Sequence, residues 1–204
     1  MVRVKICGLT GPDDLVHALN EGADAVGFVL EPSSPRYVGK HHYDIYFKLC
    51  GPYVSTVAVF GHANRSVPEA STIQAIRFDG YALPGQRLVQ TIRIRRGETA
   101  SDLPVVLPGV ETVLLDAYSE RGFGGTGKKV DWRFAGELVE DFSRRGVYVV
   151  LSGGLTPDNV AEAIRQVNPY AVDVSSGVES SPGKKDPSKV RDFIQAAKSV
   201  RAER

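Results

Sequence analysis

The chain has 204 residues, 25 lysines and arginines against 24 aspartates and glutamates, and a formal net charge of +1. A chain of this length buries most of its surface in one core, so we expect a single domain over residues 1–204. The balanced charge excludes a broad basic field for nucleic acid or for an anionic membrane surface, so any anion must be bound locally.

The N-terminal stretch MVRVKICGLT alternates charged and apolar residues. It has no apolar segment long enough for a signal peptide or a membrane span, so we expect a cytoplasmic protein with no membrane partner. Two cysteines, Cys7 and Cys50, cannot form a disulfide framework, and the four histidines lack zinc-ligand spacing. The sequence therefore predicts no metal site.

Eight short β-rich runs follow one another along the chain, each ending in a turn and most leading into a helical pattern. They span residues 2–7, 25–30, 55–60, 73–78, 90–95, 112–117, 148–152 and 170–175. Strands that alternate with helices predict parallel βα units, and eight units favour a closed barrel over an open doubly wound sheet, which stays the alternative. We therefore expect an α/β protein with a small (β/α)8 (TIM) barrel, in which the helices after the third, fourth and fifth strands are short or irregular.

Residues 6–30 and 151–175 share an order of features: a strand, Gly-Leu-Thr, Pro-Asp, an amphipathic helix and a second strand. We expect Thr10 and Thr156 to cap the two helices, with the proline and the acidic residues in the first turn. The match indicates a repeated βα module, which supports the barrel, although similar capping chemistry alone would produce part of it.

The first strand places a lone cysteine at its carboxyl end. Side chains alternate along a strand, so Val4 and Ile6 should face the helices while Lys5 and Cys7 point into the barrel. Barrel active sites lie at the carboxyl ends of the strands, and the ammonium of Lys5 one layer below would favour a thiolate, as a catalytic base requires. The pattern alone also fits a cysteine that only packs.

The sixth strand, TVLLDA, ends on an acid. The same alternation puts Leu114 and Asp116 on the inner face, with Asp116 at the mouth of the barrel. Partial burial there would raise the pKa of a carboxyl and suit it to donate a proton. The alternative is a charged residue at the entry to a loop or at a helix N-terminus.

Glycine-rich turns follow the seventh and eighth strands. Barrels frequently hold a phosphate at this place, and Gly153, Gly154, Ser176 and Gly177 would allow its close approach to the backbone, unless the glycines serve tight turns only. Arg36 follows the second strand, where its guanidinium either is solvated or clamps a carboxylate at the barrel mouth.

Residues 121–129, RGFGGTGKK, form the richest glycine segment. Gly122 to Lys128 has the spacing of a nucleotide-binding phosphate loop, but Lys129 stands where that loop needs Ser or Thr, and the segment does not follow its strand directly. We interpret it as a lid over the barrel mouth.

Seven motifs occur in a fixed order: VKICGLT, GADAVGFVLEPSSPRYV, VLLDA, GGTGKKVDW, LSGGLTPDNV, AVDVSSGVES and PGKKD. With them the chain resembles the phosphoribosylanthranilate isomerase family over most of its length. The resemblance implies a (β/α)8 barrel, no cofactor and a small phosphorylated substrate. The implied reaction is an Amadori rearrangement of N-(5-phosphoribosyl)anthranilate to 1-(2-carboxyphenylamino)-1-deoxyribulose 5-phosphate in tryptophan biosynthesis.

The resemblance also implies roles for single residues. Asp116 in the LLD motif would be the general acid, and Cys7 in the KICG motif the general base. Arg36 would bind the anthranilate carboxylate, and Asp173 would contact the ribose. The phosphate would bind around the turns after the last two strands, at Gly153, Gly154, Ser175, Ser176 and Gly177.

The fourth strand departs from the family pattern. Where the family shows Gln-Leu-His-Gly, this chain has residues 77–80, Arg-Phe-Asp-Gly. By strand alternation we expect Arg77 and Asp79 to face inward, in place of the glutamine and the histidine, as substrate-binding residues. There they pair with each other, or Arg77 offers the substrate carboxylate a second cation. A related aminoaldose-phosphate isomerase of altered specificity therefore stays open, as does a non-catalytic phosphate-binding barrel subunit. The sequence also leaves open a homodimer or an association with neighbouring pathway enzymes.

Overall fold

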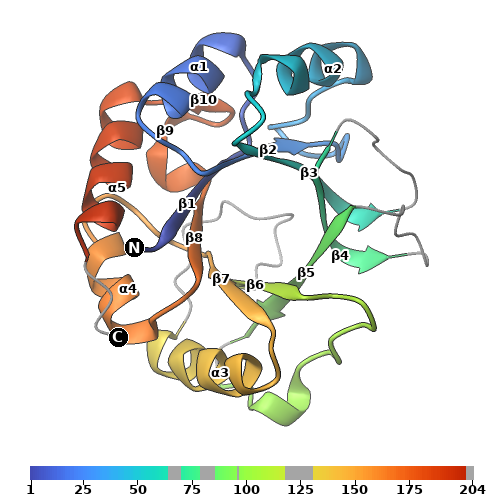
Figure 1. Ribbon diagram of the computed structural model, residues 1–204, viewed down its shortest axis with the longest axis vertical. Helices are drawn as coiled ribbons and strands as arrows, with labels where there is room; N and C mark the ends of the chain where they lie inside the picture. Colours follow the sequence, from blue (N-terminus) through green and yellow to red (C-terminus); the bar gives the residue numbers. More distant parts are fainter. Residues whose placement is uncertain (64–69, 79–85, 96, 118–130, 201–204) are drawn as a thin grey trace.

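The computed structural model describes residues 1–63, 70–78, 86–95, 97–117 and 131–200, without the side chains of residues 40, 41, 77 and 78. Eight parallel strands close a barrel in sequential order, which confirms the predicted fold and excludes the open sheet (Figure 1). The strands are β1 (Arg3–Cys7), β2 (Ala25–Val29), β3 (Ser55–Ala63), β4 (Thr72–Phe78), β5 (Arg87–Ile94), β6 (Thr112–Ala117), β7 (Tyr148–Leu151) and β8 (Ala171–Val174).

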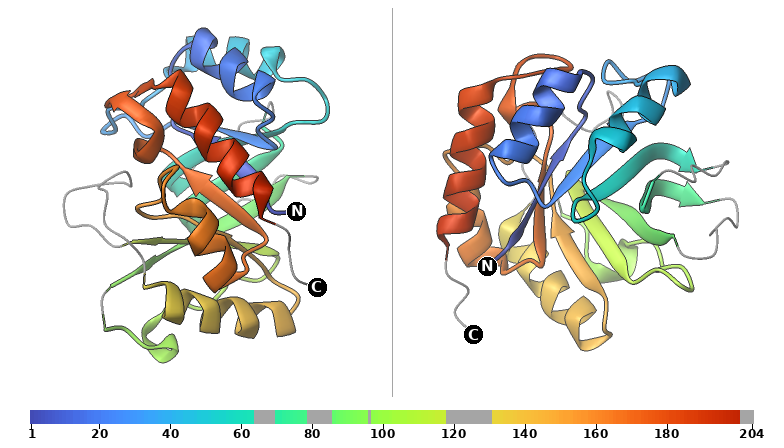
Figure 2. Two further views of the ribbon diagram at one scale, coloured as in Figure 1. Left: turned by 90° about the vertical axis from the view of Figure 1, so that its left-hand side faces the viewer. Right: turned by 45° about the horizontal axis from the view of Figure 1, so that its top comes forward.

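The α-helices lie on the outside of the barrel, and α5 lies beside both α1 and α4 (Figure 2). They are α1 (Pro12–Asn20), α2 (Lys40–Leu49), α3 (Trp132–Arg144), α4 (Val160–Val167) and α5 (Pro187–Ser199). After β5 the described residues contain only the short 3-10 helix η1 (Ala100–Asp102), as the sequence predicts. Residues 64–69 and 79–85, after β3 and β4, lie outside the described residues. None of the described helices is both long and apolar enough to cross a bilayer.

A small antiparallel hairpin follows β8. The 3-10 helix η2 (Ser176–Val178) leads directly into β9 (Glu179–Ser181), which pairs with β10 (Lys184–Lys185). The amide of Lys185 donates to Asp14 Oδ2 at 2.9 Å, so the hairpin is joined to the first turn of α1. This hairpin, which the sequence analysis did not anticipate, lies next to the site described below.

The two predicted threonine caps are wrong. Gly11 precedes α1, and the Thr10 hydroxyl instead donates to the carbonyl of Gly183 in the hairpin at 2.6 Å. In the second module Asn159 precedes α4 and accepts a hydrogen bond from the Thr156 amide at 2.8 Å. The hydroxyl of Thr10 is thus used in a long-range contact with the hairpin and not at the end of α1.

Side chains of each strand alternate between an outer layer under the helices and the barrel interior. Val4, Ile6 and Leu115 are fully buried in the outer core. A smaller interior cluster contains Leu114, Val150 and Ala171, packed against Val89. The alternation predicted for the first and sixth strands is therefore correct, and it turns Cys7 and Asp116 toward the interior of the barrel.

The contact of β2 with α2 gives a test of the outer core. Phe28 is fully buried, with its ring centroid 5.0 Å from that of Phe47. Phe28→Ala is expected to lower the free energy of unfolding by about 3–5 kcal/mol, because it leaves a cavity. Urea denaturation measures the change. Tyr53 is 99% exposed, so Tyr53→Ala should stay within about 0.5 kcal/mol of the parent protein. Equal effects of the two substitutions would contradict this packing.

Candidate active site

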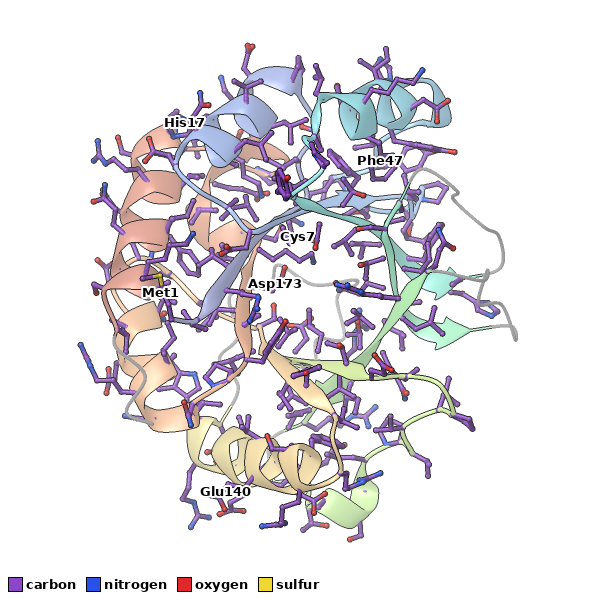
Figure 3. All side chains as sticks on the ribbon, viewed as in Figure 1. Met1, Cys7, His17, Phe47, Glu140 and Asp173 are labelled. Atoms are coloured by element: carbon purple, nitrogen blue, oxygen red, sulfur yellow. The ribbon has the colours of Figure 1, made fainter. Side chains whose placement is uncertain are left out.

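A pocket of about 810 Å³, its open mouth included, lies at the carboxyl ends of the strands. Cys7 and Asp173 project from neighbouring strands near the centre of the barrel (Figure 3). Every predicted site residue whose side chain the structure describes lines the pocket: Cys7, Arg36, Asp116, Gly153, Gly154, Asp173, Ser175, Ser176 and Gly177.

A buried ion pair lies beneath the pocket. The Lys5 ammonium donates to Asp173 Oδ1 at 2.8 Å and to Gln74 Oε1 at 2.9 Å, and the Ser152 hydroxyl donates to Asp173 Oδ2 at 3.1 Å. Burial alone would lower the pKa of Lys5, but the charges and hydrogen bonds of Asp173 and Cys7 together outweigh burial and raise the pKa. Lys5 therefore stays charged, with Asp173 as its counterion.

The Cys7 thiol is buried beside this pair. Burial raises its pKa above the ordinary value, and the opposing charge of Lys5 does not cancel the effect of burial. The sequence predicts that Lys5 lowers the pKa of Cys7, and it does, but burial and the negative charge of Asp173 outweigh this contribution. Gly27 on β2 leaves room for both groups, since a Cβ there would lie 2.8 Å from the sulfur and 3.0 Å from Lys5 Cε.

Asp116 lines the same pocket from the end of β6. Its Oδ1 accepts a hydrogen bond from the Ala117 amide at 2.9 Å. Burial, and after it the negative charge of Asp173, raises the pKa of Asp116 to about 6, although Arg93 opposes this shift. At neutral pH the pocket thus holds a carboxyl that takes up a proton more readily than usual and a thiol that keeps its proton.

Two glycine-containing loops meet at the other side of the pocket. Gly153 and Gly154 have φ of +84° and +70°, which residues with a side chain rarely adopt. Asn159 ties this loop down by donating to the carbonyl of Gly154 at 2.9 Å. A Cβ on Gly177 would overlap the carbonyl oxygen of Leu155, so the loop after β8 packs directly on the loop after β7.

The Ser175 hydroxyl lies in this second loop. It lines the pocket and is buried, and it has no hydrogen-bond partner within the described residues. A buried hydroxyl without a partner is costly, so an acceptor in the pocket would find a donor ready here.

Arg36 is neither solvated nor free at the pocket wall. It is buried, and its Nε and Nη2 donate to Glu179 Oε1 and Oε2 at 2.8 and 2.7 Å. Glu179 also accepts from the buried Lys185 ammonium at 2.9 Å. Glu179 and Lys185 were not predicted from the sequence, because the motifs that contain them carry no local pattern that indicates an ion pair.

On β4 the alternation is opposite to the one assumed for Arg77. Gln74 and Ile76 line the pocket, whereas Ile73 and Ala75 belong to the outer core. The reason is the register with β3, which sets Gln74 beside the pocket residue Val59. If the polar residue Gln74 is taken as facing inward, the alternation along β4 predicts its place in the pocket from the sequence. The side chain of Arg77, all of Asp79 and residues 121–129 lie outside the described residues.

The fold and the pocket define a (β/α)8-barrel protein with a small-molecule site at the carboxyl ends of its strands. The family model described as N-(5'phosphoribosyl)anthranilate (PRA) isomerase matches residues 98–196. A protein of Trichlorobacter lovleyi named N-(5'-phosphoribosyl)anthranilate isomerase is 45% identical over 208 residues, which cover 97% of this chain and 98% of that protein.

Solved structures agree. A phosphoribosyl anthranilate isomerase in complex with reduced 1-(o-carboxyphenylamino)-1-deoxyribulose 5-phosphate superposes with a TM-score of 0.72 at 31% identity, covering 98% of this chain and all (100%) of the other. Monomers generated from the dimeric enzyme of Thermotoga maritima give a TM-score of 0.71 at 32% identity, with the same coverage. The chain belongs to the phosphoribosylanthranilate isomerase family, which confirms the resemblance seen in its sequence.

The raised pKa of Asp116 can be measured directly. Carbon-13 NMR of the carboxyl groups should show one aspartate with a midpoint at about pH 6, which is absent from the spectrum of Asp116→Asn. Asp173→Asn should lower this midpoint, because it removes a neighbouring negative charge and leaves Lys5 uncompensated. Asp192→Asn, on the exposed face of α5, is the control and should change nothing. An unshifted midpoint in folded Asp173→Asn would refute the electrostatic cause.

Proposed function

We propose that the chain is an isomerase of tryptophan biosynthesis and catalyses the Amadori rearrangement of N-(5-phosphoribosyl)anthranilate to 1-(2-carboxyphenylamino)-1-deoxyribulose 5-phosphate. One observation carries the proposal: in a member of this family, a thiol and a carboxyl, Cys7 and Asp116, line a single pocket in which burial raises the pKa of both. This pairing also argues against a non-catalytic barrel, which would need neither group.

The first step requires an acid. Protonated Asp116 gives its proton to the furanose ring oxygen, the bond from that oxygen to C1 breaks, and C1 and the nitrogen form a cationic Schiff base. A carboxyl with a pKa of about 6 keeps a larger protonated fraction near neutral pH than an ordinary aspartate. Its position at the end of β6, open to the pocket, supports this role.

The second step requires a base. The Schiff base withdraws electrons and acidifies the proton on C2, which the thiolate of Cys7 removes. The product is an enolamine, which tautomerises to the ketone. Because burial raises the pKa of Cys7, the thiolate is a minor but strongly basic form, and Lys5 stabilises its charge when it forms.

The rest of the pocket holds the two ends of the substrate. Arg36 receives the anthranilate carboxylate, and the backbone around Gly154 and Gly177, together with the unpartnered Ser175 hydroxyl, receives the phosphate. Asp173 contacts the ribose while it keeps its bonds to Lys5 and Ser152.

Every step moves a proton or rearranges bonds within one molecule, so the proposal includes no cofactor. Within the described residues no group of three or more His, Cys, Asp or Glu side chains could hold a metal ion. The single domain over residues 1–204 and the cytoplasmic location stay predictions. A homodimer is supported by the description of the Thermotoga maritima relative as dimeric, and it too stays a proposal.

The activity is tested by adding the purified protein to N-(5-phosphoribosyl)anthranilate and following the loss of substrate fluorescence. Cys7→Ser and Asp116→Asn should each lower kcat by about 100-fold to 10,000-fold, because each removes a positioned base or acid. Cys50→Ser is the matched control: Cys50 lies outside the pocket and hydrogen-bonds the Tyr46 carbonyl, so turnover should be unchanged. No turnover by folded wild-type protein would refute the function.

The pH dependence of kcat/KM follows from the two pKa values. The working form has a proton on Asp116 and none on Cys7, while the dominant form at neutral pH has the reverse, and both bind equal numbers of protons. The ratio of these two forms does not depend on pH, so the fraction of enzyme in the working form is constant between the two pKa values. We expect kcat/KM to rise up to about pH 6, where Asp116 titrates, and to fall only above the ordinary thiol value of about 8.5.

Asp116→Asn should remove the inflection near pH 6 from its residual activity. A wild-type kcat/KM that falls as pH rises through 6 would contradict the scheme, because it would mean that Cys7 rests as a thiolate.

A further inference from the structure

A cluster of three buried charges stands behind the pocket wall where the substrate carboxylate is proposed to bind. Arg36 comes from the loop after β2, Glu179 from β9 and Lys185 from β10. Their side chains are 8%, 5% and 1% exposed. Of the three, only Arg36 lines the pocket. Glu179 and Lys185 therefore do not touch a ligand in this pocket directly.

Glu179 decides which edge of the guanidinium is available. Both of its oxygens are used on the side edge of Arg36, which consists of Nε and Nη2. A guanidinium has five N–H donors in a rigid plane, so the remaining pair of parallel donors is the end edge, formed by Nη1 and Nη2. A carboxylate entering the pocket can meet a two-pronged donor only at that end edge.

Lys185 sets the charge of the cluster. Arg36 and Glu179 alone would be a neutral pair with little attraction for an anion. Lys185 donates to Glu179 Oε1 at 2.9 Å and to the carbonyl of Ser175 at 3.1 Å, so two cations share one carboxylate and the cluster keeps a net charge of +1. Bonds from Arg36 and Lys185 outweigh burial and hold the pKa of Glu179 below its usual range, so this carboxylate is ionised.

The backbone around the cluster is shaped to hold Arg36 in this place. Gly8, with φ of +72°, follows Cys7 directly, and a Cβ there would lie 2.6 Å from Arg36 Cδ. The arginine thus crosses the end of β1 over a residue without a side chain. Glu179 is anchored in turn, because the Lys189 ammonium donates to its carbonyl at 3.0 Å.

We propose that Glu179 is a positioning residue, which holds Arg36 by its side edge and so aims the end edge at the substrate carboxylate, while Lys185 preserves the positive charge of the site. The inference rests on the proposed function, because it takes the carboxylated ring of phosphoribosylanthranilate as the ligand of Arg36. It assigns specificity for that carboxylate to the hairpin β9–β10, outside the pocket itself.

The test compares two probes that differ only in the carboxylate: the reduced product, 1-(2-carboxyphenylamino)-1-deoxyribitol 5-phosphate, and its phenylamino counterpart without the carboxyl group. Calorimetry gives the ratio of their affinities. Glu179→Gln should reduce this ratio about 10-fold, as expected for loss of an aligned charged pair, while the affinity for the probe without the carboxylate changes less than about 2-fold. In turnover, KM should rise while kcat stays within about 3-fold.

A double-mutant cycle separates positioning from a general structural effect. Arg36→Met should remove the preference for the carboxylated probe, and adding Glu179→Gln to it should then change nothing further. If Glu179→Gln weakens both probes equally, or still lowers the ratio when Arg36 is methionine, its role is structural and the inference is wrong.

Charge balance gives the second variant, because Glu179→Gln leaves two buried cations without a counterion and can destabilise the fold. Glu179→Gln with Lys185→Met restores the net charge of +1 and should restore thermal stability, yet the ratio should stay low because Arg36 is no longer held. A ratio at the wild-type value in this double variant would overturn the inference. If wild-type protein binds both probes but does not turn over substrate, the proposed function fails; if it turns over substrate and Glu179→Gln keeps the ratio, only the inference fails.

Discussion

The ion pair between Lys5 and Asp173 joins the first strand of the barrel to the last and places two charges in its interior. Each would be costly there alone, and together, with Gln74 and Ser152 as further partners, they are satisfied. The pair also sets the ionisation of its neighbours. Asp173 raises the pKa of Asp116, while Lys5 is too well balanced to outweigh the burial of Cys7. The chemistry of the mouth therefore depends on a contact one layer beneath it.

Small residues make this layer possible. Gly27 lies against the Cys7 sulfur and Lys5 Cε, and Gly8 lies against Arg36. A Cβ atom at either glycine would come so close to these atoms that they would have to move. Gly177 has the same part in the contact between the two loops proposed to hold the phosphate. Close packing of a thiol, an ammonium and a guanidinium around one pocket thus requires glycine at two positions. These are Gly8, which follows Cys7, and Gly27, which faces it from β2, and turn geometry alone does not explain both.

Local pattern was enough to predict the barrel, because each strand needs only its own alternation of apolar and polar residues and each helix its own turn. It was also enough for Cys7 and Asp116, whose inward direction follows from the same alternation. It failed where a partner is distant. Glu179 lies 143 residues from Arg36, and nothing in either segment indicates that they meet. The alternation of β4 was misjudged at Gln74 and Ile76, which line the pocket, because it depends on the register of β4 with β3. The cap at Thr10 was misjudged because its hydroxyl bonds to the hairpin β9–β10.

The two buried clusters differ in net charge, and each net charge fits the role proposed for the neighbouring part of the pocket. Lys5 and Asp173 sum to zero beside Cys7 and Asp116, while Arg36, Glu179 and Lys185 sum to +1 at the carboxylate end of the pocket. A net positive charge beside Asp116 would favour its carboxylate form and lower the pKa that is now about 6, so it would weaken the acid. A neutral cluster at the other end would not attract an anion. Because the excess cation lies away from Asp116, the pocket proposed to bind a molecule with two anionic groups still holds a protonatable carboxyl.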